Sequence, residues 1–246
     1  MNRHAILLWC MLVVVSSRKK NKGTRQFEAK FASDIKKGKE SKCGDIVAAA
    51  RNGDMEVLMP GGHPLPKGQI EINCKDKHGF APLHHAARKG QMVFLEALLD
   101  LGADVKNVDR RGWTPLYEAA FWGQSTATKR LLRAGSDVTI REKTGKEALH
   151  IACMGRSENV PRIVNNLIKG NANVNAQDNN GWTPLHYAVE NLCTGCVKKL
   201  IKNGANPKQK DKKDESPLML AKRLDHATEL YGVMMETWNE HRQREL

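Results

Sequence analysis

The hydrophobic and polar positions of this chain repeat with a period close to 33 residues. Each unit places a polar, glycine-containing stretch before a short apolar block, and residues 109–120 (DRRGWTPLYEAA) show the pattern most clearly. The residue before a shared leucine anchors each unit, with spacings of 33, 33, 36 and 33 between Pro82, Pro115, Ala148, Pro184 and Pro217. Self-similarity at a fixed period of this size indicates a solenoid of stacked repeats.

The start of each unit carries the signals of a short first helix. Thr114 and Thr183 stand where an N-cap hydroxyl is needed, and the proline after each suits the first helical position. A histidine recurs three residues after the cap, where a ring nitrogen can reach back as the carboxylate of a capping box does. We therefore predict structural capping roles for His84, His150 and His186.

A second helix follows in each unit after a polar turn. Apolar side chains recur at helical spacing, as along 94–99 and 163–168, and predict a buried stripe. A residue suited to the left-handed conformation then ends the helix, at Gly102, Gly135, Asn171 and Gly204. The chain runs on to another glycine, such as Gly79 or Gly112, which predicts a tight turn.

The unit resembles the ankyrin repeat, whose T-P-L-H-x-A signature is matched by 183–188 (TPLHYA) and 81–86 (APLHHA). The resemblance implies an all-α repeat solenoid of helix-turn-helix repeats with β-hairpin loops. About six repeats are expected, including degenerate terminal ones that cap the core. The array would cover 43–235, with repeats near 43–75, 76–108, 109–141, 142–177, 178–210 and 211–235.

Three segments flank the array. Residues 1–17 (MNRHAILLWCMLVVVSS) fit a secretory signal peptide cleaved near Ser17, and the apolar run is too short for a normal membrane span. Alternatives are a buried or fraying N-terminal segment or a mistaken start, since the family that the repeats resemble is overwhelmingly intracellular. Residues 18–42 form a basic arm that we expect to be disordered, and 236–246 a charged helix end.

Charge concentrates in that arm. The net charge is +13, and residues 1–42 hold 11 Lys and Arg against 3 Asp and Glu. The stretch 18–22 (RKKNK) has the composition of a nuclear localisation signal or a nucleic-acid contact, and the alternative that we favour is a solvated charge run. The repeat array itself is only mildly cationic.

No catalytic or metal-binding constellation is recognisable in the sequence. Phosphate-binding, nucleophile-elbow and zinc-protease motifs are absent, so we expect a non-enzymatic protein without a cofactor. Cys193 and Cys196 form one C-x-x-C, but a zinc site needs four ligands and a thioredoxin-like site a βαβ context. If residues 1–17 are removed, five cysteines remain, and this odd number weighs mildly against a disulfide framework and secretion.

The resemblance also implies where a partner protein binds: at the hairpin tips and the exposed inner face of the first helices. Carried over position by position, the candidate contacts are Lys77, His78, Phe80, Arg110, Arg111, Trp113, Phe121, Trp122, Lys143, Lys146 and Trp182. An aromatic before T-P-L is also a common packing residue in this family. Adjacent Phe121 and Trp122 cannot easily share one buried face. We therefore hypothesise a hot spot at Trp122, flanked by Arg110 and Arg111, for an acidic segment that bears apolar residues.

Three functions remain open on this evidence, and a fourth, an enzyme that uses the Cys193 and Cys196 pair, is the one we favour least. The leading one is a monomeric protein–protein interaction scaffold or adaptor, inside the cell in cytoplasm or nucleus. The second is a nuclear regulator whose basic arm contacts nucleic acid or acidic proteins, with binding that depends steeply on salt. The third is a secreted ankyrin-type effector, which requires cleavage near Ser17.

Overall fold

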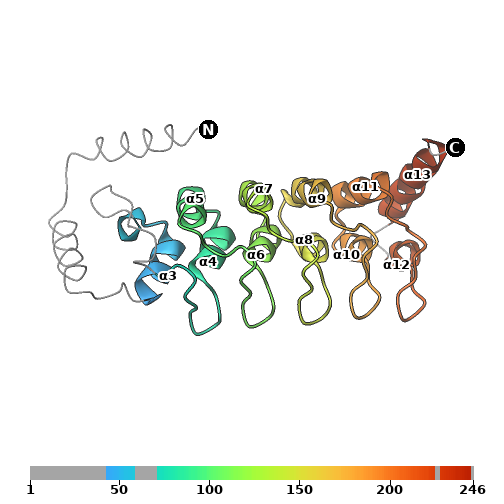
Figure 1. Ribbon diagram of the computed structural model, residues 1–246. Helices are drawn as coiled ribbons and strands as arrows, with labels where there is room; N and C mark the ends of the chain where they lie inside the picture. The colour runs from blue at the N-terminus through green and yellow to red at the C-terminus, as the bar shows by residue number, and fades with distance from the viewer. Residues whose placement is uncertain (1–42, 59–70, 225–227, 245–246) are drawn as a thin grey trace, which may run out of the picture.

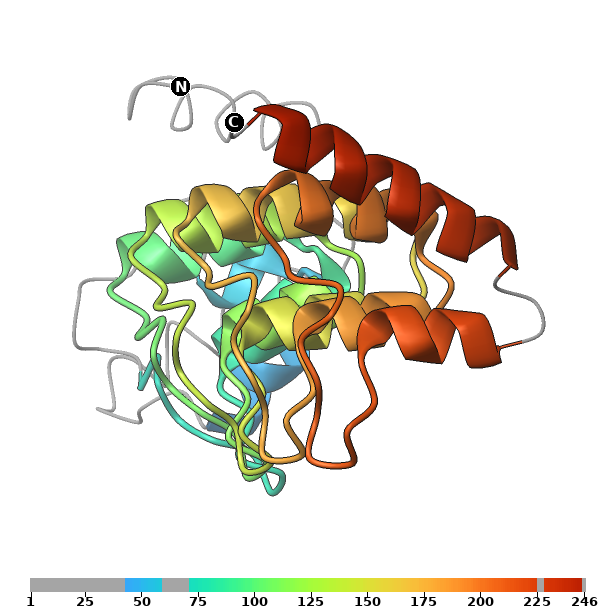
Figure 2. The same ribbon diagram turned by 90° about the vertical axis from the view of Figure 1, so that its right-hand side faces the viewer.

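The computed structural model describes residues 43–58, 71–224 and 228–244. Two rows of helices run side by side along a straight array, and loops project from one edge of the inner row (Figures 1 and 2). Consecutive inner helices pack on one another, and each also packs on the outer helix that follows it in the chain. The predictions made on residues 1–42 concern a part of the chain outside the described residues.

The helices alternate between the inner and the outer row. The inner row holds α3 (Cys43–Asn52), α4 (Pro82–Lys89), α6 (Pro115–Phe121), α8 (Ala148–Met154), α10 (Pro184–Glu190) and α12 (Pro217–Arg223). The outer row holds the 3-10 turn η1 (Met55–Val57), α5 (Met92–Asp100), α7 (Ser125–Arg133), α9 (Val160–Lys169), α11 (Thr194–Lys202) and α13 (Thr228–Arg244). A second helix was predicted in every unit; in the first unit the 3-10 turn η1 stands at that place.

The start of each inner helix follows from its cap and proline. Pro82, Pro115, Pro184 and Pro217 occupy the first turn of their helices, where no N–H is required. Residues just past the outer helices adopt positive φ, including Asn171 at 66°. The tip turns also need positive φ, and Asp214 takes it at 63° where the other tips have glycine. These turn predictions are confirmed.

The projecting loops are tight turns rather than paired strands. Each tip is closed by two backbone hydrogen bonds, as from Asp109 N to Trp113 O (2.9 Å) and from Gly112 N to Asp109 O (3.1 Å). Neighbouring tips are joined by single bonds, such as Arg110 N to His78 O (3.4 Å). Within the described residues no strand forms, because both bonds of a tip belong to its turn and no further pairs extend them into a ladder.

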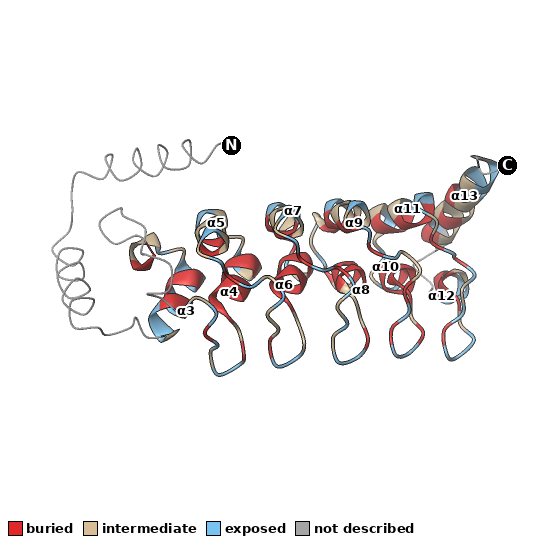
Figure 3. Ribbon diagram, in the orientation of Figure 1, coloured by how far each residue is buried: buried red, intermediate tan, exposed pale blue. Residues whose placement is uncertain are grey.

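The core lies between the two rows of helices (Figure 3). Small residues such as Ala86 and Ala119 are fully buried on the inner helices and let them approach closely. The outer helices bury one stripe each, which includes Phe94, Leu95 and Leu98 on α5. At the C-terminal end, α13 packs on α11 and α12 and runs unbroken past position 235, where we expected the repeat domain to end.

Two disulfides join cysteines of the described chain. Cys43 at the start of α3 bonds to Cys74, 31 residues later, and Cys193 bonds to Cys196 in the first turn of α11. Cys153 is free and fully buried, and burial raises the pKa of its thiol well above the ordinary value. The inference that an odd number of cysteines disfavours a disulfide framework is therefore wrong, because the fifth thiol is packed in the core and needs no partner.

Candidate functional site

Each tip turn is built around an acidic side chain that accepts backbone N–H groups. Asp109 Oδ1 accepts from the N–H of Arg111 and of Trp113, both at 2.8 Å. Asp76, Asp178 and Asp211 make the same pair of bonds in their own tips. One carboxylate oxygen thereby closes the turn, and the other oxygen contacts a side chain, which differs from tip to tip.

The second oxygen has a matching partner on the inner helix in two repeats. His85 Nε2 lies 3.0 Å from Asp76 Oδ2, and the Tyr187 hydroxyl donates to Asp178 Oδ2 at 2.6 Å. In the third repeat the equivalent position is Glu118, whose ionised carboxylate accepts hydrogen bonds and has none to donate to Asp109. Two carboxylates therefore face each other beneath this tip.

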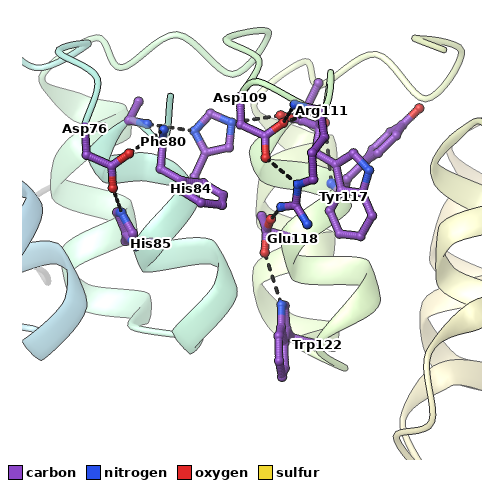
Figure 4. Close-up of polar contacts among 12 residues, drawn as sticks. Asp76, Phe80, His84, His85, Asp109, Arg111, Tyr117, Glu118 and Trp122 are labelled. Carbon is purple, nitrogen blue, oxygen red and sulfur yellow. Dashed lines mark hydrogen bonds and ion pairs between the residues drawn. The ribbon is translucent and has the colours of Figure 1, made fainter. Parts of the chain in front are cut away.

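Arg111 resolves that conflict by lying between the two acids (Figure 4). Its Nε donates to Asp109 Oδ2 at 2.9 Å, and its guanidinium pairs with Glu118 Oε1. The guanidinium carbon also lies 4.0 Å from the ring centroid of Trp113. Glu118 is 0% exposed. Burial raises the pKa of Glu118 above its ordinary value, although Arg111 and Arg88 oppose the shift.

The other oxygen of Glu118 holds Trp122 in place. The indole Nε1 donates to Glu118 Oε2 at 3.1 Å, and the guanidinium carbon of Arg88 lies 4.4 Å from the centroid of the Trp122 ring. Trp122 nevertheless remains 46% exposed. The ring is therefore fixed by a hydrogen bond and a cation–π contact while much of its surface faces solvent.

The remaining predicted aromatic contacts pack against neighbours. Phe121 makes edge-to-face contacts with both Trp113 and Trp122, at 5.4 and 5.6 Å between ring centroids. Phe80 lies against His84 and His85, and Trp182 stacks on His186 at 5.6 Å. These rings are half-buried against neighbouring side chains, whereas Trp122 is exposed to solvent.

The predicted basic residues divide in the same way. Lys77, Arg110 and Lys143 occupy the same position in successive tips and are exposed. Lys146 is half-buried, with Nζ 5.8 Å from the ring centroid of Tyr187. Arg88 lies over the Trp122 ring, and Arg111 is linked to Trp122 through Glu118. The hypothesis of a hot spot at Trp122 flanked by Arg110 and Arg111 stays a prediction.

The repeat histidines take the geometry expected of caps and also reach the next repeat. The backbone N–H of Ala81 donates to His84 Nδ1 (3.1 Å), so the proton lies on Nε2, which donates to Trp113 O (2.9 Å). His150 and His186 make equivalent bonds. Burial lowers the pKa of His84 and of His150 to about 4, so both rings are neutral at pH 7.

The two threonine caps differ in detail. Thr114 Oγ1 accepts from the N–H of Tyr117 at 3.4 Å. The Thr183 hydroxyl instead lies 2.9 Å from His186 Nδ1. Tyr117 stands where other repeats carry histidine. Its hydroxyl lies within hydrogen-bond distance of the carbonyl oxygen of Ile140 in its own repeat and of that of Lys146 in the next.

Glu118 was not among the contacts predicted from the sequence. A signal for Glu118 existed, because an acid stands where other repeats carry His85 or Tyr187. Within the described ranges, no group of His, Cys, Asp and Glu side chains is arranged to hold a metal ion. None of the helices in those ranges is both long and apolar enough to cross a membrane.

Comparison with known proteins agrees with this architecture. A family model described as ankyrin repeats in three copies matches residues 46–142 and 123–211, more than half of the chain. The chain is an ankyrin repeat protein. Its repeats belong to a family whose members generally mediate protein–protein interaction.

Several curated proteins share this ankyrin array. Oxysterol-binding protein-related protein 1 of Rattus norvegicus is 39% identical over 220 residues, covering 76% of this chain and 22% of that protein. The 2-5A-dependent ribonuclease of Homo sapiens is 42% identical over 60 residues, covering 24% and 8%. Neurogenic locus notch homolog protein 1 of Homo sapiens is 38% identical over 102 residues, covering 41% and 4%. The chain thus spans about a fifth or less of the length of these relatives.

Proposed function

We propose that this ankyrin array is a non-enzymatic protein-binding module that recognises an acidic segment bearing apolar residues. The observation that carries the proposal is the exposed Trp122 ring, held between Arg88 and the buried Glu118. Tryptophan and arginine are the residue types that most often dominate binding energy at interfaces. We call Arg88, Arg111, Phe121 and Trp122 the Trp122 surface.

Fixing the ring in advance favours binding. An exposed tryptophan that moved freely would lose side-chain entropy on association, at a cost of about 0.5–1.5 kcal/mol. Here the indole N–H and one ring face already have partners, so little ordering remains to be done. An apolar side chain of the partner would cover the exposed part of the ring.

The tips supply the preference for acidic partners. Lys77, Arg110 and Lys143 are exposed at equivalent positions. Their tips are joined by backbone hydrogen bonds, from Arg110 N to His78 O and from Lys143 N to Arg111 O, both at 3.4 Å. The cations therefore form a row in register. An acidic stretch of the partner would follow this row while its apolar residue contacts Trp122.

The test uses synthetic peptides that place one Leu or Phe among Asp and Glu, compared with peptides that carry Lys and Arg instead. Fluorescence anisotropy should detect binding of the acidic set only, with affinity that falls as salt rises. Trp122→Ala should weaken binding at least tenfold, as expected of an interface anchor worth about 2 kcal/mol.

Val93→Ala is the matched control, because Val93 is also an exposed apolar residue (43%) but lies on the outer helix α5. It should leave the affinity unchanged. Equal affinities of wild-type protein and Trp122→Ala for every bound peptide would remove Trp122 from the site. Charge reversal of Lys77, Arg110 and Lys143 together should reduce both the affinity and its salt dependence.

Secretion is a second candidate supported by one observation. Four cysteines of the described chain are paired in disulfides and the fifth is buried, and disulfides persist chiefly in oxidising compartments. The expected outcome is a mature chain in the medium of expressing eukaryotic cells, beginning near residue 18. An intact Met1 in the cell lysate, with nothing in the medium, would exclude this candidate and leave an intracellular adaptor.

A further inference from the structure

The fifth repeat carries a disulfide where other repeats carry different residues. Cys193 occupies the position of Gln91 and Gln124, and Cys196 that of Ala127. Gln124 uses its amide to join repeats, donating to Arg88 O at 3.3 Å. Cys193 instead bonds to Cys196 within the first turn of its own helix, with Cα atoms 5.2 Å apart.

Access to the two sulfur atoms is unequal. Cys196 is 0% exposed, in the core with Val197 and Leu200, whereas Cys193 is half-buried at the start of α11. Of the two residues, only Cys193 has surface exposed to solvent, so an attacking thiolate approaches the bond from the Cys193 side. This asymmetry defines which sulfur forms a mixed disulfide and which one leaves.

The first turn of α11 also stabilises the thiolate form of Cys193. The backbone N–H of Cys196 points at Cys193 Sγ with a separation of 3.3 Å. A hydrogen bond to sulfur stabilises the thiolate, which is the reactive form of cysteine. The rest of α11 stays anchored when the bond opens, because Val197, Leu200 and Ile201 are all 0% exposed. The two thiols then remain close enough to re-form the bond.

We propose that Cys193 and Cys196 form a reversible thiol–disulfide exchange site for small-molecule thiols of the glutathione type. A thiolate attacks Cys193 Sγ, the Cys193–Cys196 bond breaks, and Cys196 leaves as a thiolate that takes up a proton. A second thiolate attacks the mixed disulfide, releasing the oxidised small-molecule disulfide and the Cys193 thiolate. The oxidised disulfide reverses both steps, so electrons and atoms balance in each direction.

The site lies in the same row as the proposed binding surface. Residues 190–193 form the turn from α10 to α11, equivalent to residues 121–124, which carry Trp122 in the third repeat. The exchange reaction does not depend on the proposed partner, because it involves only these cysteines and a soluble thiol.

The experiment uses the full chain with single substitutions borrowed from the other repeats. Cys196→Ala introduces the residue that α7 has there, and Cys193→Gln introduces the residue of the second and third repeats. Each variant is incubated with oxidised glutathione and mapped by peptide mass spectrometry. Cys196→Ala should gain one glutathionyl group on Cys193, whereas Cys193→Gln should gain none on the buried Cys196.

Wild-type protein provides the second measurement. Reduced glutathione should open the Cys193–Cys196 bond, oxidised glutathione should restore it, and hydrogen exchange along 197–202 should remain slow throughout. Absence of an adduct on Cys193 in the Cys196→Ala variant would overturn the proposal. Equal modification of Cys193 and Cys196 in the two variants, or unfolding of α11 on reduction, would overturn it as well. Circular dichroism confirms that each variant is folded, and Cys153 is the unreactive internal reference.

Discussion

The disulfide between Cys43 and Cys74 should act as a clamp on the first repeat. In the described part of that repeat, α3 packs on α4, Arg51 pairs with Asp76 at 3.1 Å, and Asn73 Oδ1 accepts from the N–H of Asp104 at 2.8 Å. The Arg51 side chain is 48% exposed, so this ion pair is weak. Replacing both cysteines by serine therefore removes the strongest single tie at this end of the solenoid.

The size of the effect follows from the loop that the bond closes. The two cysteines are 31 residues apart. In the chain-entropy model a loop of that length contributes about 3.7 kcal/mol at 25 °C. A terminal repeat contacts only one neighbour, so the loss should appear first as local opening of the first repeat.

Hydrogen exchange with mass spectrometry, together with urea unfolding, measures both parts of this prediction. In the double variant, exchange along α3 and η1 should accelerate while exchange along α8 to α11 stays slow. The free energy of unfolding of the N-terminal part should fall by about 3–4 kcal/mol relative to the oxidised wild-type protein.

The double variant Cys193→Gln with Cys196→Ala is the matched control. Its disulfide spans only three positions that α11 already holds close together, so at most about 2 kcal/mol should be lost, at the opposite end of the array. A loss below about 1 kcal/mol for the Cys43 and Cys74 pair, or exchange that accelerates evenly along the chain, would refute the clamp.

Three further predictions concern single residues. His84 and His150 have pKa values of about 4 when folded, against an ordinary 6.5. The unfolded chain therefore binds protons first as pH falls below 6.5. The free energy of unfolding should drop by about 3 kcal/mol for each histidine by pH 4. Urea titrations at a series of pH values measure this drop. Leu192 has φ of 53° and is 46% exposed, so Leu192→Gly should raise stability by about 1 kcal/mol in thermal unfolding, and a lowered Tm would contradict this. Glu118→Ala should lower the free energy of unfolding by roughly 1–3 kcal/mol because Arg111 loses a buried acceptor. Glu118→Gln should lower it by less, since the amide keeps an oxygen that can accept. Equal losses for the two variants in urea unfolding would argue against the hydrogen bonds.

Much of the fold could be predicted because each repeat is specified by neighbouring residues. Prolines at the first helical position, glycines at the tips and apolar stripes act within one turn or one helix. Cap histidines such as His84 could be predicted as well, since Nδ1 reaches a backbone N–H only three residues away. Their second bond, from Nε2 to the next repeat, depends on how repeats stack and could not be read from one unit.

The candidate site depends on contacts that the local sequence pattern does not specify. The sequence by itself determined the period, the helices, the tip turns and the exposure of a tryptophan beside Phe121. Only the tertiary structure decided that Arg111 lies between Asp109 and Glu118, because the tip must fold back over its own helix to bring two acids together. Stacking of repeats placed Arg88 on the Trp122 ring. The Cys43–Cys74 pairing likewise depends on the packing of α3, since spacing alone does not fix disulfide connectivity.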